Sequence, residues 1–204
     1  MTYGGHMNSF FMNKTMSFIK SNGKYSEEEL LKIEYGMEGI FLTITKVLII
    51  LLIGIIFKYL DTVILTLLFF NILRFFAFGL HAKKSWQCLI ISIIQFNILP
   101  YILINISVGN PLIILVGTFS SLSFLFFAPS DTEKRPLTNK KKRIVRKVLS
   151  IITAIIFTIV ALHFNFISEV IVSALLIESF MVNPLSYKML GLKYNNYKKK
   201  EVKA

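Results

Sequence analysis

The sequence predicts an all-α integral membrane protein with about six transmembrane helices and an N-terminal amphipathic helix. Of the 204 residues, 54% are hydrophobic and only 17% are charged, which is too apolar for a soluble domain of this size. The apolar residues also gather into six runs of 16 to 20 residues, near the length that a bilayer core demands.

The N-terminal part of the chain predicts two helices before the first apolar run. Residues 8–20 place apolar side chains at helical spacing with lysines available to the polar side, which is typical of a helix lying on the membrane surface. Ser26, followed by three glutamates, is a capping-box sequence, so a second helix should begin there and lead into the bilayer. We assign residues 1–38 to these amphipathic and cytoplasmic helices and expect no cleavable signal peptide.

The apolar runs and the cations between them predict the topology. The runs are residues 39–57, 62–80, 89–108, 112–127, 148–166 and 167–182. The connections after the first, third and fifth runs are very short, whereas the other connections and both ends of the chain hold nearly every cation. By the positive-inside rule, both termini and the basic loops should face the cytoplasm. We assign residues 39–182 to one polytopic membrane domain and residues 183–204 to a basic cytoplasmic tail.

Charged residues inside two of the runs leave an alternative open. Arg74 interrupts the second run, and Glu169 and Glu178 lie in the sixth. A re-entrant segment could replace either span. The two glutamates are nine residues apart, so on one helix they point in opposite directions and cannot form a carboxylate pair.

The composition excludes several classes of function. The chain has 23 Lys and Arg against 11 Asp and Glu, but these cations lie between apolar runs and not on one compact domain, so we expect no nucleic-acid partner. A single cysteine excludes an internal disulfide framework. Three scattered histidines and one cysteine give no metal-ligand spacing, and we expect neither a metal nor another cofactor.

The polar segment from Arg74 to Cys88 holds the candidate catalytic pair, His81 and Cys88. The two residues are seven apart, which on a continuous helix gives the same face but about 10 Å of rise. A thiol and an imidazole that exchange a proton need hydrogen-bond contact, so we predict a bend near Gly79 or between residues 83 and 85. By spacing alone, a loop histidine and an inert cysteine fit this segment at least as well.

Neighbouring polar residues offer supporting roles, each with a simpler alternative. Lys83 and Lys84 could lower the thiol pKa or bind an acidic substrate, or could only set topology. Arg74 could pair with Asp131, Glu133 or a substrate carboxylate, or could extend toward the membrane surface. Asp131 could orient His81, although it also fits a turn. Gln87 could donate a hydrogen bond to an oxyanion.

The chain closely resembles the accessory gene regulator B family (AgrB) in size, in span pattern and in motif order. The motifs that carry the resemblance are the N-terminal amphipathic helix, Arg74, Gly79, His81-Ala82, Cys88, Ala128-Pro129-x-Asp131-Thr132-Glu133 and Pro136-Leu137. One departure is that Phe78-Gly79-Leu80 replaces the double glycine that members often show before the histidine.

This resemblance implies a membrane endopeptidase that processes the quorum-sensing precursor peptide AgrD in the bacterial cytoplasmic membrane, with its active site on the cytoplasmic side. Cys88 would be the nucleophile and His81 the general base and then acid, giving an acyl thioester that an internal cysteine or serine of the precursor displaces to form a thiolactone or lactone. A homodimer fits the family. The acidic tail of the precursor would meet a set of basic residues: Lys83, Lys84, Lys134, Arg135, Lys140, Lys141, Lys142 and Arg143.

Two other functions remain open from the residues alone. A small transporter would line its pathway with Arg74, Glu169 and Glu178, and a noncatalytic membrane scaffold would use Cys88 only for packing. Under the peptidase hypothesis Glu178→Gln is expected to matter little for cleavage, whereas it should impair a transporter strongly.

Overall fold

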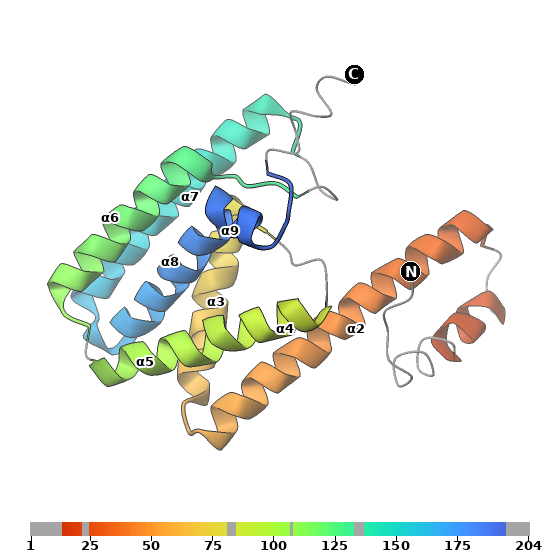
Figure 1. Cartoon of the computed structure of the whole chain (residues 1–204), viewed down its shortest axis with the longest axis horizontal. Helices are drawn as coiled ribbons and strands as arrows, with labels where there is room; N and C mark the ends of the chain where they lie inside the picture. The colour runs from red at the N-terminus through yellow and green to blue at the C-terminus, as the bar shows by residue number, and fades with distance from the viewer. Residues whose placement is uncertain (1–13, 22–24, 81–84, 107, 133–136, 195–204) are drawn as a thin grey trace. The chain divides into compact units, whose positions relative to one another are not determined.

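A computed structural model describes residues 14–21, 25–80, 85–106, 108–132 and 137–194. Nearly all of these residues are helical (Figure 1). The only bridge of extended backbone among them joins Phe78 to Ser130. The predicted all-α class is therefore confirmed. The chain divides into two compact units, Met1–Ile49 and Ile50–Ala204.

The first unit contains one of the two helices expected from the N-terminal sequence and most of the other. Residues 14–21 are helical, which confirms the described part of the amphipathic helix, while residues 8–13 lie outside the described residues. Helix α2 (Glu27–Ile56) begins directly after Ser26, as predicted. The Glu29 N–H donates to the Ser26 hydroxyl at 3.3 Å, and the Ser26 N–H donates to the Glu29 carboxylate at 2.9 Å. With 30 residues, α2 is about 45 Å long and exceeds a bilayer core.

In the part of the chain that the structure describes, six helices are long and apolar enough to cross a membrane, which confirms the predicted number and makes this a multi-pass membrane protein. After α2 come α3 (Leu60–Ala77), a third span made of α4 (Ser85–Ile93), η1 (Ile94–Ile98) and α5 (Leu99–Ile106), then α6 (Asn110–Phe127), α7 (Lys140–His163), the short η2 (Asn165–Ile167) with α8 (Ser168–Val182), and finally α9 (Pro184–Met189).

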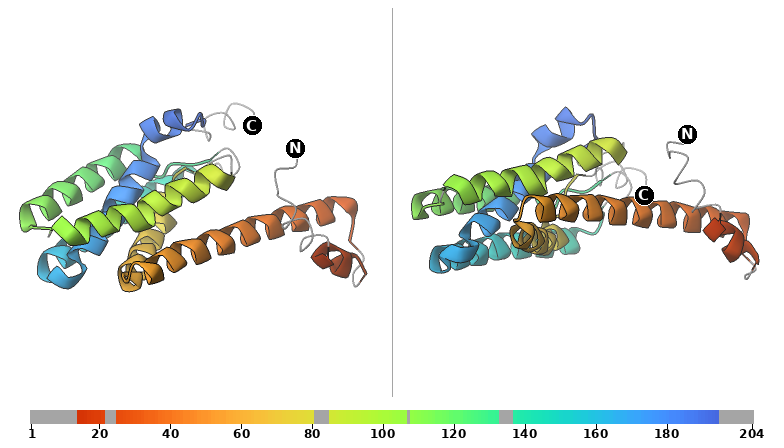
Figure 2. Two further views of the ribbon diagram at one scale, coloured as in Figure 1. Left: turned by 60° about the horizontal axis from the view of Figure 1, so that its bottom comes forward. Right: turned by 90° about the horizontal axis from the view of Figure 1, so that it is seen from below.

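Helix α8 lies at the centre of the second unit, where it packs against α3, α5, α6 and α7 (Figures 1 and 2). Of the sixth span, 67% of the residues are buried, against 33% or less in each of the other five. Ile171, Val172 and Leu175 have no exposed surface. The sixth apolar run is therefore a continuous helix, and it owes its apolar sequence to neighbouring helices more than to lipid.

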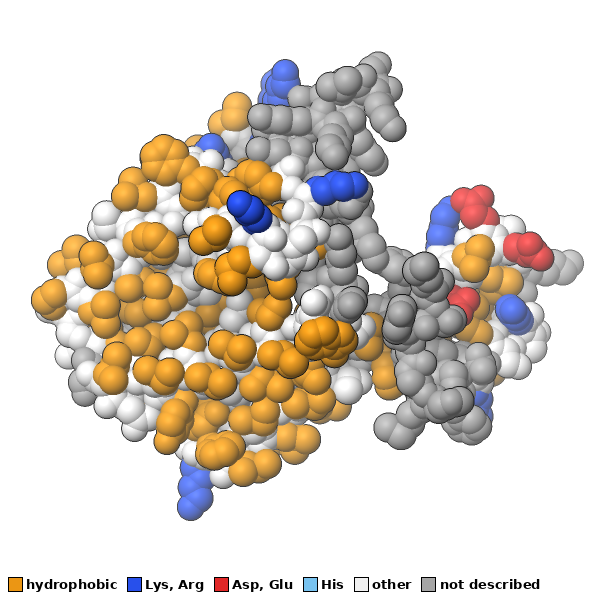
Figure 3. Space-filling model, in the orientation of Figure 1, with side chains coloured by type: hydrophobic (Ala, Val, Ile, Leu, Met, Phe, Trp, Pro, Cys, Tyr) orange, Lys and Arg blue, Asp and Glu red, His pale blue; other side chains and the backbone are white. Residues whose placement is uncertain are grey.

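The outer surface of the second unit is apolar. Large hydrophobic side chains from all of the surrounding helices are exposed, and they cover most of the described face in Figure 3 with few charges among them. Exposed apolar area on this scale is expected where lipid is the solvent. Between helices the packing is close: Gly117 of α6 leaves no room for a side chain beside Thr158 of α7.

Two helix boundaries differ from the sequence prediction for local reasons. Helix α3 ends at Ala77, three residues early, because Phe78 and Gly79 have φ angles of +60° and +132° that a helix cannot contain. Helix α7 starts at Lys140, eight residues before the expected apolar run, because the Asn139 side chain caps it by accepting from the Lys142 N–H at 3.1 Å. The cations of residues 140–147 are thus on a helix.

The third span changes its winding at η1, a π-helical segment. The buried side chains of Gln95 and Asn97 belong to this segment, and the Tyr59 hydroxyl donates to the Asn97 side-chain oxygen at 3.2 Å. Tyr59 also packs its ring 5.4 Å from that of Tyr101 on α5. These contacts attach the turn between α2 and α3 to the second half of the third span.

Candidate functional site

The chain leaves α3 through the 78–80 turn (Phe78, Gly79 and Leu80), directly before His81. Distant segments hold this turn by backbone hydrogen bonds. The Gly79 N–H donates to the Ser130 carbonyl at 2.8 Å, and the Leu80 N–H donates to the Met181 carbonyl at 3.1 Å. The predicted bend near Gly79 is confirmed, and its position is fixed by the ends of α6 and α8.

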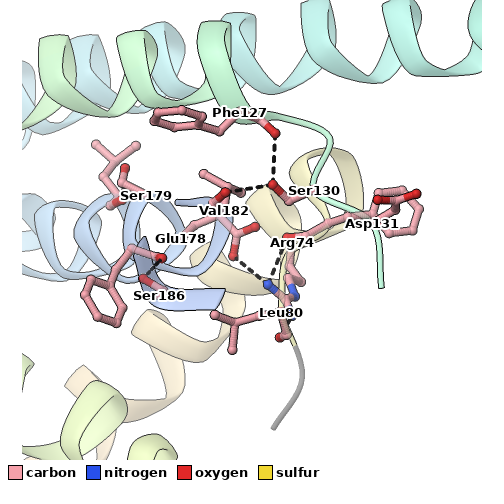
Figure 4. A network of polar contacts seen from close by, with 12 residues as sticks. Arg74, Leu80, Phe127, Ser130, Asp131, Glu178, Ser179, Val182 and Ser186 are labelled. Carbon is pink, nitrogen blue, oxygen red and sulfur yellow. Dashed lines mark hydrogen bonds and ion pairs between the residues drawn. The ribbon is translucent and has the colours of Figure 1, made fainter. Parts of the chain in front are cut away.

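Arg74, on the last turn of α3, folds its guanidinium over the 78–80 turn (Figure 4). Its Nη1 donates to the Phe78 carbonyl at 2.8 Å and lies 3.5 Å from the Glu178 Oε2, while its Nη2 donates to the Leu80 carbonyl. Glu178 is completely buried in α8. A buried carboxylate is costly unless a cation balances it, and Arg74 supplies that charge.

Residue 79 has no room for a side chain, because the Arg74 guanidinium occupies the space where a β-carbon would lie. A β-carbon at residue 79 would overlap the Arg74 guanidinium and come within 3.1 Å of the Met181 carbonyl. Its φ of +132° is also a conformation that residues with side chains rarely adopt. Glycine at this position is therefore required by both the backbone and the ion pair.

The 128–131 loop (Ala128 to Asp131), which follows α6, packs beside the 78–80 turn. The Ser130 N–H donates to the Ala77 carbonyl at 3.0 Å, so Ser130 both gives and receives a backbone hydrogen bond across this joint. Its hydroxyl lies 2.7 Å from the Val182 carbonyl and 2.9 Å from the Phe127 carbonyl. Ser130 therefore connects the ends of α3, α6 and α8.

Helix α9 closes the same joint from the C-terminal side. The buried Tyr187 hydroxyl lies 3.3 Å from the carbonyls of both Ser130 and Asp131 and donates to them. Burial raises the pKa of Tyr187 well above its ordinary value, and the nearby Arg74 only partly opposes this. The phenol therefore stays protonated and able to donate through the neutral pH range.

Asp131 faces the start of α7. Its Oδ2 accepts from the Leu137 N–H at 3.2 Å and lies 3.8 Å from Arg143 Nη1. Arg143 also donates to the Pro129 carbonyl at 3.4 Å. Of the predicted tail-binding cations on α7, Arg143 thus contacts the 128–131 loop, whereas Lys140, Lys141 and Lys142 are exposed.

Arg146 ties α7 to the end of α3. Its guanidinium donates to the Phe75 carbonyl and lies 4.4 Å from the centre of the Phe78 ring. A cation over an aromatic face is attractive, so this contact holds the Phe78 side chain while the backbone turns. The 78–80 turn is consequently held by α6, α7 and α8 together.

Cys88 lies in the first turn of α4, directly after Gln87, and both side chains are half-buried. Helix α4 starts at Ser85, five residues beyond Leu80, so the chain between them spans at most roughly 18 Å. The other predicted site residues, His81, Lys83, Lys84, Lys134 and Arg135, lie outside the described residues. The pairing of His81 with Cys88 stays a prediction.

The partner of Arg74 is the main feature that sequence reasoning missed. We expected Asp131, Glu133 or a substrate carboxylate, but the structure pairs Arg74 with Glu178, and Asp131 faces Arg143; Glu133 lies outside the described residues. One signal was present, because charges inside membrane spans are expensive and tend to pair with each other. The sequence could not show which helices are neighbours.

Comparison with known proteins identifies the family. Residues 12–182 match the family model described as Accessory gene regulator B. An AgrB-like protein of Listeria welshimeri is 34% identical over 184 residues, covering 89% of this chain and 90% of the relative. An AgrB-like protein of Clostridium acetobutylicum is 31% identical, covering 83% of this chain and 82% of its own length.

A further relative carries the family name in full. Accessory gene regulator protein B of Staphylococcus aureus is 29% identical over 184 residues, covering 88% of this chain and 97% of its own length. No solved protein structure matches the chain. Because the family model spans all six apolar helices and the Arg74 to Cys88 segment, this chain belongs to the accessory gene regulator B family.

Proposed function

We propose that this chain is a membrane cysteine endopeptidase of an accessory gene regulator quorum-sensing system, cutting the C-terminal tail from an AgrD-like precursor peptide and supporting ring closure of the product. The observation that carries the proposal is the family match over residues 12–182, which contains Cys88 and His81. The hydrogen bonds of the 78–80 turn support the proposal, since they anchor the chain immediately before His81.

The proposed reaction has two acyl transfers. The Cys88 sulfur attacks the scissile carbonyl while His81 accepts the thiol proton, and the C–N bond then breaks as His81 returns that proton to the departing amine. The acidic tail leaves, and a thioester joins Cys88 to the rest of the precursor. A cysteine thiol or serine hydroxyl inside the precursor attacks this thioester, which closes the ring and regenerates the Cys88 thiol.

The surroundings of Cys88 suit this chemistry. Cys88 is the chain's single cysteine and lies where an apolar span begins, so the reacting carbonyl would be largely shielded from water that could hydrolyse the thioester. Cys88 lies at the N-terminal end of α4, toward which the backbone N–H groups of a helix point, and the neighbouring Gln87 adds a side-chain donor. These groups are suited to an oxyanion on the tetrahedral intermediate.

Charge placement supports a cytoplasmic site. The ends of α3 and α6 and the start of α7 lie together, as the hydrogen bonds of Arg146 and Arg143 require, and the exposed Lys140, Lys141 and Lys142 share this end. Cations concentrate on the cytoplasmic side of membrane proteins. This end of the helices would therefore face the cytoplasm, where the acidic tail of the precursor can meet the three lysines.

The test is cleavage by the full chain, purified and reconstituted in lipid nanodiscs, of a synthetic AgrD-like peptide encoded beside it. Intact-mass spectrometry should detect release of the acidic tail and an acyl adduct on Cys88. Cys88→Ala should abolish both, and Ser92→Ala, a buried change one turn further along α4, should abolish neither. A Cys88→Ala protein that still cuts at the original rate would remove Cys88 as the nucleophile.

The transporter alternative gains no support from the geometry. Arg74 and Glu178 bind each other, and Glu178 has no exposed surface, so the pair does not line an open pathway among the described residues. Glu169 lies at the other end of α8, where the Ser168 hydroxyl donates to it at 3.1 Å.

A further inference from the structure

We infer that Glu178 is a positioning residue for the proposed cleavage: through Arg74 it holds the 78–80 turn, the backbone to which the proposed general base is directly bonded, and so fixes the direction in which the chain leaves α3. This inference rests on the proposed function. It concerns a residue in the sixth span, 90 positions away from Cys88, and it reverses the sequence-based expectation that Glu178→Gln matters little for cleavage.

The first step is that Arg74 is the one cation paired with Glu178 among the described residues. It lies in the buried C-terminal half of α8, and the Arg74 guanidinium 3.5 Å away balances its charge. Neither carboxylate oxygen has a partner that meets hydrogen-bond geometry among the described residues, so the attraction to Arg74 is mainly electrostatic. Removing the Glu178 charge would leave the buried part of Arg74 without compensation.

The second step is that the same guanidinium holds the 78–80 turn by hydrogen bonds. Arg74 donates to the carbonyls of Phe78 and Leu80, on both sides of Gly79, and fills the space above Gly79. Bonds to one planar, multi-donor group fix direction as well as distance. A guanidinium that is no longer drawn toward Glu178 can rotate away, and both carbonyls then lose their donor.

The third step is chain connectivity. Leu80 is bonded to His81, and the Leu80 N–H is itself held by the Met181 carbonyl, three residues along α8 from Glu178. Helix α8 therefore acts on the turn twice, through its backbone and through the ion pair. Since a displacement of about 1 Å in a catalytic group can slow a reaction by roughly a hundredfold, a loosened turn should lower the rate without removing the substrate-binding surface.

The experiment compares Glu178→Gln with the wild-type chain in nanodiscs. For the variant, kcat for tail release should fall roughly a hundredfold, whereas KM should stay within about threefold. Glu178→Asp, which keeps the charge, should recover part of the rate. The matched control is Glu169→Gln, the same change on the same helix at a site remote from Arg74, and it should keep the wild-type kcat.

A second readout does not need the precursor. Cys88 is the chain's single thiol, so its reaction with iodoacetamide can be followed cleanly from pH 6 to 9. If His81 activates Cys88, His81→Ala will lower the alkylation rate on the acidic side of this profile, and Glu178→Gln should change the profile in the same direction. Glu169→Gln should leave it unchanged.

The outcomes separate the two levels of the proposal. If either the kcat or the alkylation profile of Glu178→Gln equals that of the wild type, the positioning role is overturned, even when Cys88→Ala is inactive. If Cys88→Ala still cuts, the proposed function fails first. Should Glu178→Gln not fold, the apolar double variant Arg74→Met, Glu178→Met replaces it, since such exchanges often preserve stability. A folded double variant with a low kcat supports the inference, and one with the wild-type kcat overturns it.

Discussion

The connections between helices are of two kinds, and they differ in where their hydrogen bonds go. In the short turns around Lys58, Gly109 and Asn165, the backbone N–H groups bond to carbonyls no more than five residues away. In the 78–80 turn and the 128–131 loop, the backbone N–H groups of Gly79, Leu80 and Ser130 bond to segments more than 50 residues away. The first kind is built by its own sequence. The second exists only when three helices are already in place.

Four substitutions, accompanied by three control variants, probe this difference, and the largest effect is expected in the 78–80 turn. Gly79→Ala puts a β-carbon where the Arg74 guanidinium lies and imposes a side chain at a φ of +132°. We expect a loss of roughly 3 kcal/mol or more in stability and at least about a hundredfold in cleavage. Thermal unfolding in detergent and peptide cleavage measure the two effects.

Gly109→Ala is the matched control in a short turn. Gly109 has a φ of −81°, and an added β-carbon would meet only the Pro111 ring, at 3.7 Å. Its effect should stay within about 0.5 kcal/mol. Equal losses at the two glycines would mean that the two kinds of connection do not differ as described.

Ser130→Ala tests the 128–131 loop, which is hydrogen-bonded to the 78–80 turn. The buried Ser130 hydroxyl is hydrogen-bonded to the Val182 and Phe127 carbonyls, so its removal should lower the free energy of unfolding by about 1 to 2 kcal/mol. Ser121→Ala removes a hydroxyl that bonds only within α6, to the Gly117 carbonyl, and should cost less than about 0.5 kcal/mol. Chemical or thermal unfolding that ranks Ser121 above Ser130 would contradict the long-range role.

Tyr187→Phe sharpens the comparison through pH. Burial raises the pKa of Tyr187 above the ordinary tyrosine pKa of about 10. Above pH 10 the unfolded chain therefore loses the phenol proton while the folded chain still retains it. The contribution of Tyr187 to the free energy of unfolding should therefore be constant below pH 10 and should fall as the pH rises above 10. Tyr187→Phe should cost about 1 kcal/mol near neutral pH and flatten the alkaline decline. An unchanged alkaline slope in the variant would assign the decline to other groups.

Lys58→Gly is expected to have the smallest effect. Lys58 is exposed and has a φ of +61°, which glycine adopts without strain. The variant should gain about 0.5 kcal/mol, with no change in cleavage, because this turn contacts neither the 78–80 turn nor the 128–131 loop by any described hydrogen bond. Lys58→Ala should gain nothing. A loss of cleavage in Lys58→Gly would show that the short turns also serve the site.

The same difference explains what the sequence could predict. Apolar runs, the Ser26 capping box and the short turns are local features, and the corresponding helices are found where they were expected. The early start of α7 was missed although Asn139 is a local signal, because the expected boundary followed hydropathy alone. The partner of Arg74 lies 104 residues further along the chain, and no local pattern specifies it.

For the candidate site, the sequence named residues and the structure supplied their setting. Gly79, Arg74 and Asp131 were singled out by type and position, and all three lie at the joint where α3, α6 and α8 end. Their contacts depend on which helices pack side by side, which single-sequence reasoning cannot derive. The geometry between His81 and Cys88 remains a prediction, since His81 lies outside the described residues.

The π-helical segment η1 sets how the two halves of the third span are rotated relative to each other. Such a segment accommodates one extra residue, which rotates everything before it by about 100° relative to everything after it. The half that carries Cys88 and the half in which Tyr101 packs against Tyr59 are therefore offset from the register that one uninterrupted α-helix would give them. Deleting a single residue within η1 would swing the sulfur to another side of the span while leaving the aromatic half seated.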